Sequence, residues 1–308
     1  MTARRRWWRL LQVLLGVLVI GLAVRSLARN WDLLTAQPLQ WEVDLRLLVA
    51  SAATVWAAYA VLVEAWRRVV VGMRQRLAYL DAARICMLAN LGRYVPGKVW
   101  SIAGAALLSR QAGVDASAAV AAAFVLQALS LASGVLVVAA VAPATLSEVS
   151  GTFVAVVVTA GIVAAAGVLL LTSERCLATI RRIFPVVPAG ITAVPLGTML
   201  AAFAANIVAW GAYGLAFLLL AKGLAPNADL SWFRATAVFA SSYVVGLVAV
   251  FAPAGIGPRE SMFVLLLQGI VGPKLALALA VAARVLLTIT ELGAALPFLA
   301  RSAGMREQ

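Results

Sequence analysis

The chain has 308 residues, of which 64% are hydrophobic and only 12% charged, and its mean hydropathy is +1.01. Soluble domains are about half apolar and about a quarter charged, so this composition excludes an ordinary soluble protein. The net charge of +13 does not indicate nucleic-acid binding, because most lysines and arginines fall in short connectors, where they set membrane topology and meet anionic headgroups. Cys86 and Cys176 are far apart and the chain has no histidine, so neither a metal site nor a cofactor is expected.

Long uncharged segments predict an all-α polytopic membrane protein. The segments 116–147 and 183–221 contain no charged residue and exceed the ~20 apolar residues that cross a bilayer as a helix. The N-terminal segment has the charged-then-apolar order of a signal peptide, but no small-residue cleavage site follows it, so we expect a retained first helix. The six predicted full transmembrane helices cover about 10–28, 45–63, 116–142, 152–172, 193–220 and 275–300.

Two further segments are too short to cross the membrane in one pass. The first, about 77–109, is interrupted by Pro96 and Gly97 and leaves an uncharged run of 11 residues, 99–109. As a helix this run is roughly 17 Å long, against a hydrocarbon core of about 30 Å. The second, about 232–272, is interrupted by the sequence APAGIGPRE. Each segment predicts a re-entrant broken-helix hairpin, whose irregular backbone must be covered by protein or water.

The two broken segments are related by their spacing. Pro96 and Pro253 are 157 residues apart, and so are Gln127 and Arg284 on the helices that follow each break. Two full crossings lie between the units, so they are expected to form an inverted repeat, which is typical of secondary transporters. The alternative is that the breaks are two unrelated kinks.

A single integral membrane domain, 1–308, is expected. Its parts are the N-terminal helices 1–76, the first re-entrant unit with its helix 77–142, the connecting helices 143–230, and the second re-entrant unit with its helix 231–301. With six crossings, both termini and every strongly basic connector face the cytoplasm, as the positive-inside rule requires. The predicted location is therefore the cytoplasmic (inner) membrane.

The breaks predict a site for the phosphate of a lipid. A helix that begins just after Pro96 or Pro258 directs unpaired backbone N–H groups into the protein, and such helix ends suit phosphate. Nearby glycines let the backbone approach a ligand, and nearby cations add charge. Snorkelling of Arg93 and Lys98 toward the headgroups is the alternative. The candidate lipid-phosphate-binding residues are Arg93, Pro96, Gly97, Lys98, Gly255, Gly257, Arg259 and Arg284.

A polar stripe marks the last predicted helix, where Arg284, Thr288 and Glu291 are spaced at i, i+4 and i+7. A charge inside a span costs at least ~2.5 kcal/mol, so such residues face the interior and find partners. Arg284 and Glu291 are too far apart to pair with each other. Arg259 and Glu260 at the second break are the nearest candidates. Glu260 and Glu291 are thus predicted to gate the site or to form ion pairs, and a purely structural ion pair is an equal alternative.

Four segments occur in order over most of the chain: NLGRYVPGKVW, LLSRQAGV, FAPAGIGPRESMF and ALAVAARVLLTITELGAAL. Together they resemble the lysylphosphatidylglycerol synthase transmembrane family, also called the flippase-like domain family. The chain departs from many members at Val99 and Trp100, where they have a small residue. The positions that match the motifs of the family are Asn90, Pro96, Gly97, Lys98, Pro253, Gly255, Gly257, Glu260 and Arg284.

The resemblance implies lipid translocation. In fused relatives the domain is associated with moving an aminoacylated phosphatidylglycerol between leaflets, after a soluble synthase domain makes it. This chain is expected to be a stand-alone member without the synthase, and related stand-alone members are associated with other lipids, including polyprenyl-linked sugars. The expected function is therefore a flippase-like transporter of an anionic, aminoacylated or polyprenyl-linked phospholipid.

A different class of function stays open, namely a non-transporting membrane scaffold or regulator. Its partner would be a lipid-modifying or glycosyl-transferring enzyme. The chain itself is expected not to be an enzyme, because it has no histidine, no nucleophile–base set, no glycine-rich nucleotide loop and no acidic metal cluster. An enzyme that acts on polyprenyl phosphate is the third alternative.

Overall fold

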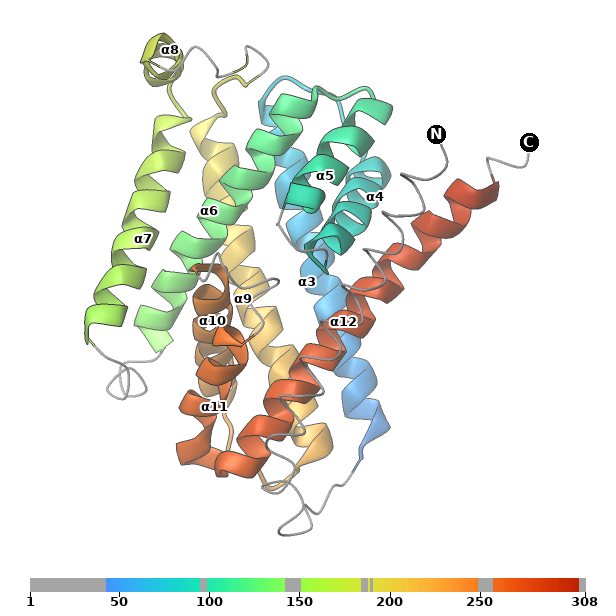
Figure 1. The fold of residues 1–308 in the computed structure, drawn as a ribbon, viewed down its shortest axis with the longest axis vertical. Coiled ribbons are helices and arrows are strands. Elements are labelled where there is room, and N and C mark those ends of the chain that lie inside the picture. Colours follow the sequence, from blue (N-terminus) through green and yellow to red (C-terminus); the bar gives the residue numbers. More distant parts are fainter. Residues whose placement is uncertain are drawn as a thin grey trace, which may run out of the picture.

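The computed structural model describes residues 43–94, 99–141, 151–183, 188, 191–248 and 257–304. All regular elements in these residues are helices, which confirms the predicted all-α class. In chain order (Figure 1) they are α3 (Leu45–Gly72), α4 (Tyr79–Asn90), the short 3-10 helix η1 (Leu91–Tyr94), α5 (Val99–Gln111), α6 (Ala116–Val141), α7 (Gly151–Leu170), α8 (Glu174–Ile183), α9 (Leu196–Leu224), α10 (Trp232–Val248), α11 (Pro258–Val271) and α12 (Pro273–Gly304).

Four helices of the described residues, α3, α6, α9 and α12, are long and apolar enough to cross a membrane, and they match four of the predicted spans. Helix α7 occupies the predicted span 152–172, and the chain then bends by 104° into α8. The segment expected to be a basic connector is therefore itself a helix, which buries Leu177 and exposes Arg175 and Arg182. The predicted first span, 10–28, lies outside the described residues.

Both broken segments form hairpins, as predicted. Helix α4 runs inward from the end of α3, and α5 returns beside it, with Gly104 packed on Ala89. Helices α10 and α11 form the second hairpin. Figure 1 shows that the first hairpin occupies the half of the molecule that contains α8, whereas the second occupies the opposite half. The two hairpins thus start from opposite ends of the helical bundle, in the inverted arrangement that the spacing predicts.

Two apolar clusters anchor the hairpins to the long helices. One cluster packs the first hairpin against α3 and α6, and it fully buries Val69, Ile85 and Ala118. The other packs α9, α10, α11 and α12 together around Phe217 and Phe263. Alanine is frequent in both clusters, and such small residues let membrane helices approach closely.

Helices α9 and α10 are in close contact at Gly214. A Cβ atom there would lie 1.9 Å from Thr236 Oγ1 and 2.6 Å from Thr236 Cα, a backbone atom that cannot rotate away. We expect Gly214→Ala to lower the free energy of unfolding by about 1–3 kcal/mol. Gly197 in the first turn of α9 has no atom within 4 Å of a built Cβ, so Gly197→Ala should leave stability unchanged or slightly raised. Thermal unfolding in detergent compares the two variants, and equal melting temperatures would contradict this account of the packing.

Candidate functional site

Two charged residues of α12 connect this helix to the two hairpins. Glu291, whose side chain is only 3% exposed, forms an ion pair with Arg93 of η1 in the first hairpin. Arg284 Nη1 lies 3.3 Å from Glu260 Oε1 of α11 in the second hairpin. Because Arg284 and Glu291 are seven residues apart, the two ion pairs are separated by about 10 Å along the helix axis. Each hairpin therefore forms an ion pair with the same helix, α12.

The carboxylate of Glu291 is held by several donors. In addition to the Arg93 guanidinium, Tyr94 Oη donates a hydrogen bond to Glu291 Oε2 at 2.6 Å, and Tyr59 Oη reaches Oε1 at 3.5 Å. Arg93 Nη1 also donates to Asn90 Oδ1 at 3.3 Å, which orients the guanidinium. A buried carboxylate is stable only when it is paired and hydrogen-bonded in this way. Arg93 thus pairs with an interior acid.

The ion-pair partners predicted for Arg284 and Glu291 of α12 are correct only in part. The expectation that Glu260 lies beside Arg284 is confirmed. The expectation that Arg259 is the nearest partner of Glu291 is wrong, because Glu291 pairs with Arg93, 198 residues earlier in the chain. The reason is topological, since α12 passes both hairpins and its later turn contacts α4 and η1.

Helix α11 begins where the sequence predicts. Gly257 is the N-cap residue, and its φ of +96° is one that side chains with a Cβ rarely adopt. Pro258 occupies the first helical position, where a missing N–H costs nothing. Glu260 Oε2 accepts a hydrogen bond from the backbone N–H of Gly257 at 2.8 Å, while Oε1 faces Arg284. Glu260 therefore links the start of the helix to α12.

Arg259 differs from the other two arginines of the site. Its side chain is buried, with 5% exposed. The guanidinium carbon lies 5.1 Å from the ring centroid of Phe239, 5.5 Å from that of Tyr243 and 5.8 Å from that of Phe263. Such cation–π contacts contribute about 0.5–2 kcal/mol each. Within the described part of the chain, the buried Nη2 atom has no hydrogen-bond partner.

The predicted site residues fall into two groups. The structure brings Gly257, Arg259, Glu260 and Arg284 together at the second hairpin, and it joins Arg93 to Glu291 at the first. The remaining predicted residues, Pro96, Gly97, Lys98 and Gly255, lie outside the described residues. In residues 43–94, 99–141, 151–183, 188, 191–248 and 257–304, no three His, Cys, Asp or Glu residues gather as a metal site would require.

Sequence reasoning missed the aromatic residues around the charges. Tyr94 follows Arg93 directly in the segment NLGRYVPGKVW, and this adjacency could have indicated that both bind the same acid. Phe239 and Tyr243 are spaced at i, i+4, as are Arg259 and Phe263, so each pair shares one helix face. Tyr59 gave a weaker signal, because it shares an otherwise apolar span with the hydroxyls of Ser51 and Thr54.

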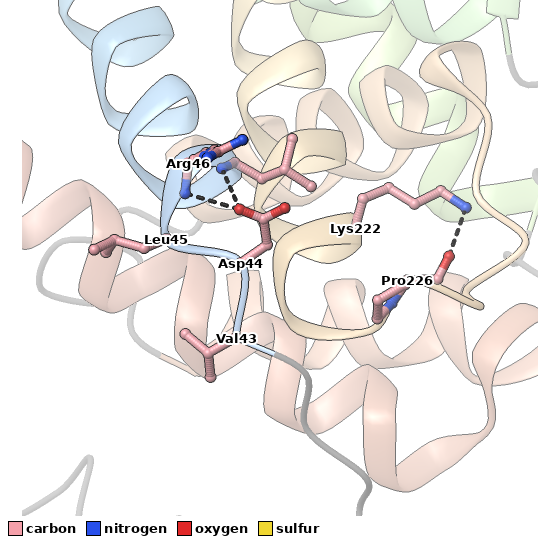
Figure 2. Close-up of a pocket in the computed structure, with 7 residues that line it drawn as sticks. Val43, Asp44, Leu45, Arg46, Lys222 and Pro226 are labelled. Carbon is pink, nitrogen blue, oxygen red and sulfur yellow. Dashed lines mark hydrogen bonds between the residues drawn. The ribbon is translucent and has the colours of Figure 1, made fainter.

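A pocket in the structure lies elsewhere, at the start of α3 and the end of α9 (Figure 2). Its polar groups serve the local backbone: Asp44 accepts from the N–H groups of Arg46 and Leu47, and Lys222 donates to the carbonyl of Pro226. Tyr59, which reaches Glu291, lies 15 residues after Asp44 along α3, a helical distance of about 22 Å. The pocket is therefore not part of the ion-pair site.

A known protein family matches nearly the whole chain. The family described as the lysylphosphatidylglycerol synthase TM region matches residues 10–293, a range that includes both hairpins and the charged stripe of α12. No curated protein matches the chain. An all-helical membrane protein with two inverted hairpins, matched over nearly its whole length, this chain belongs to the lysylphosphatidylglycerol synthase transmembrane family, which is related to lipid handling.

Proposed function

We propose that the protein is a lipid flippase-like transporter, which moves an anionic, aminoacylated or polyprenyl-linked phospholipid between the leaflets. One observation carries the proposal: two hairpins that start from opposite ends of the bundle are each ion-paired to the same helix, α12. A charged headgroup that crosses the hydrocarbon core needs compensating charge along its path. The cations of both hairpins and of α12 supply it within the protein.

The phosphate of a headgroup is suited to compete for the arginines of these ion pairs. It carries negative charge and accepts parallel hydrogen bonds from a guanidinium, as a carboxylate does. When phosphate replaces Glu260 on Arg284, the second hairpin loses its ion pair to α12 while the arginine stays neutralised. Replacement of Glu291 on Arg93 has the same effect at the first hairpin. In this mechanism Glu260 and Glu291 act as gates, one on each side of the site.

We propose that the protein lies in the cytoplasmic (inner) membrane. The end of the molecule that contains α8 then faces the cytoplasm. The C-terminal end of α12 lies at this end (Figure 1), and the positive-inside rule favours the side where basic residues gather. Helix α8 leaves α7 at a sharp angle and carries arginines suited to anionic headgroups. The basic residues in and next to the connectors at this end are Arg74, Arg76, Arg110, Arg175, Arg181 and Arg182.

Cysteine labelling tests this orientation. In a Cys86→Ser/Cys176→Ser background, Gln111→Cys and Asn227→Cys each introduce one thiol at an exposed position, at opposite ends of the bundle. We expect a membrane-impermeant maleimide to label Asn227→Cys in right-side-out vesicles and Gln111→Cys in inside-out vesicles. The reverse pattern would contradict the proposed orientation.

Reconstitution tests the proposed function. Leaflet exchange of labelled anionic, aminoacylated and polyprenyl phospholipids is measured in proteoliposomes beside protein-free vesicles. We expect the protein to accelerate exchange of at least one of these lipids. If folded protein accelerates none of them, the transporter proposal is wrong. The scaffold alternative then gains support, and it predicts a stable lipid-modifying or glycosyl-transferring enzyme partner in mild detergent.

A further inference from the structure

Arg259 carries a charge that the described site does not neutralise. Arg93 pairs with Glu291, and Arg284 pairs with Glu260. No carboxylate of the described residues lies within ion-pair distance of Arg259. The sequences of the two hairpin connections, 95–98 and 249–256, contain no acidic residue either, and they add only the cation Lys98.

The surroundings of Arg259 fix the position of its guanidinium but leave one of its nitrogen donors without an acceptor in the described part of the chain. Three aromatic rings, from Phe239, Tyr243 and Phe263, surround the cation. The ring faces offset part of the cost of burying the charge, yet they accept no conventional hydrogen bond from Nη2, which is buried and without a partner in the described part of the chain. A buried, fixed donor with excess positive charge is suited to an anionic ligand.

We infer that Arg259 is the principal contact for a phosphate anion, and that the lipid headgroup bound here is a phosphodiester of net negative charge without an aminoacyl group. The phosphate supplies the missing charge and the missing acceptor for Nη2. Arg259 is itself the second residue of α11, where the partial positive charge of the helix start also favours an anion. Naming the anion a lipid headgroup rests on the proposed function, whereas the anion contact at Arg259 rests on its burial and contacts.

An aminoacylated headgroup fits the described site poorly. Its ammonium group needs a carboxylate or a free aromatic face. While Arg259 holds the phosphate, both acids of the site, Glu260 and Glu291, stay paired with arginines, and the three rings near Arg259 contact its guanidinium. A second cation in this space would be repelled by Arg259. The charges of the site therefore favour phosphatidylglycerol over its aminoacylated form.

Lipid binding to the purified full chain tests this inference. Native mass spectrometry in detergent compares phosphatidylglycerol, lysylphosphatidylglycerol and phosphatidylcholine on the wild-type protein, with inorganic phosphate as a competitor. We expect phosphatidylglycerol to bind at least tenfold more tightly than either other lipid. If lysylphosphatidylglycerol binds as tightly, the exclusion of aminoacyl groups is wrong. If millimolar phosphate displaces phosphatidylglycerol completely, the site takes free phosphate and the lipid assignment is overturned.

Two substitutions assign the binding to Arg259. Arg259→Gln and Arg259→Met should both remove the tenfold preference for phosphatidylglycerol. Arg234→Gln removes the same charge from an arginine of the same hairpin whose side chain is 52% exposed, and it should keep the preference. Arg259→Met deletes an unpaired buried charge without leaving a polar group, so its melting temperature should not fall. A preference that survives in both Arg259 variants overturns the inference.

Leaflet exchange on the same preparations separates this inference from the proposed function. Binding that depends on Arg259, without acceleration of exchange by the wild type, supports the anion contact and overturns the transporter. Exchange of phosphatidylglycerol that proceeds at the wild-type rate in Arg259→Met, with unchanged binding, overturns the role of Arg259 and leaves the transporter standing.

Discussion

Glu291→Gln is expected to lower the free energy of unfolding by about 3 kcal/mol, because it leaves the Arg93 guanidinium without its buried counter-charge. The substitution also weakens the hydrogen bond that Tyr94 donates at 2.6 Å to the carboxylate. The expected loss lies at the lower end of the range for broken buried pairs, because the Arg93 side chain is 28% exposed. Unfolding in detergent, followed by heat or by denaturant, measures the change.

Glu64 provides a matched control for Glu291. It lies in α3 and also pairs with arginines, at 2.7 Å from Arg67 and 2.8 Å from Arg68, but these partners are one turn away on the same helix. The Glu64 side chain is 28% exposed, against 3% for Glu291, and pairs within one helix contribute at most about 1 kcal/mol, so Glu64→Gln should cost far less than Glu291→Gln. The double variant Arg93→Met/Glu291→Met should recover part of the loss, since it removes both charges. Equal effects of Glu64→Gln and Glu291→Gln would contradict the proposed role of Glu291.

Arg284→Gln is expected to slow lipid exchange at least tenfold. A hydrogen bond to a charged group contributes about 1.5–3 kcal/mol, and 1.4 kcal/mol corresponds to a factor of ten in rate. The fold should tolerate the change, because Glu260 keeps its hydrogen bond to the N–H of Gly257 and is 24% exposed. Arg284→Lys should retain part of the activity, since lysine keeps the charge but not the bidentate geometry. Initial rates in proteoliposomes measure both effects.

Arg234→Gln is the control for Arg284→Gln, since it removes the same charge from an exposed position at the start of α10. It should exchange lipid at the wild-type rate. A loss of exchange in both variants would indicate a general effect of net charge, and the specific role of Arg284 would then be wrong.

The hairpins could be predicted from the sequence because their cause is local. An uncharged run as short as 99–109, next to Pro96 and Gly97, cannot cross the bilayer whatever its neighbours are. That α8 is a helix was harder to predict, because an arginine-rich segment of a membrane protein is usually a connector. Arg175 and Arg182 are seven residues apart and share one helix face, while Leu177 lies on another. This pattern indicates an amphipathic surface helix only when the chain is known to bend after α7.

The chemistry of the site was predictable residue by residue, but only one of its two ion pairs, Arg284 with Glu260, was. The stripe of Arg284 and Glu291 required interior partners on energetic grounds alone. Sequence distance favoured Arg259 as a partner, whereas the fold brings Arg93 to Glu291 from 198 residues away. The aromatic surroundings of Arg259 depend on the packing of α10 against α11, so only the i, i+4 spacings within each helix could have suggested them.

The proposed transport mechanism requires both hairpins and α12 to bind the headgroup together. Its most direct test is the initial rate of phosphatidylglycerol exchange between leaflets in proteoliposomes of the wild type and of the double variant Lys98→Gln/Arg284→Gln, with equal amounts of folded protein. The account predicts acceleration by the wild type and a rate close to that of protein-free vesicles for the variant. Equal acceleration by the two proteins would contradict it.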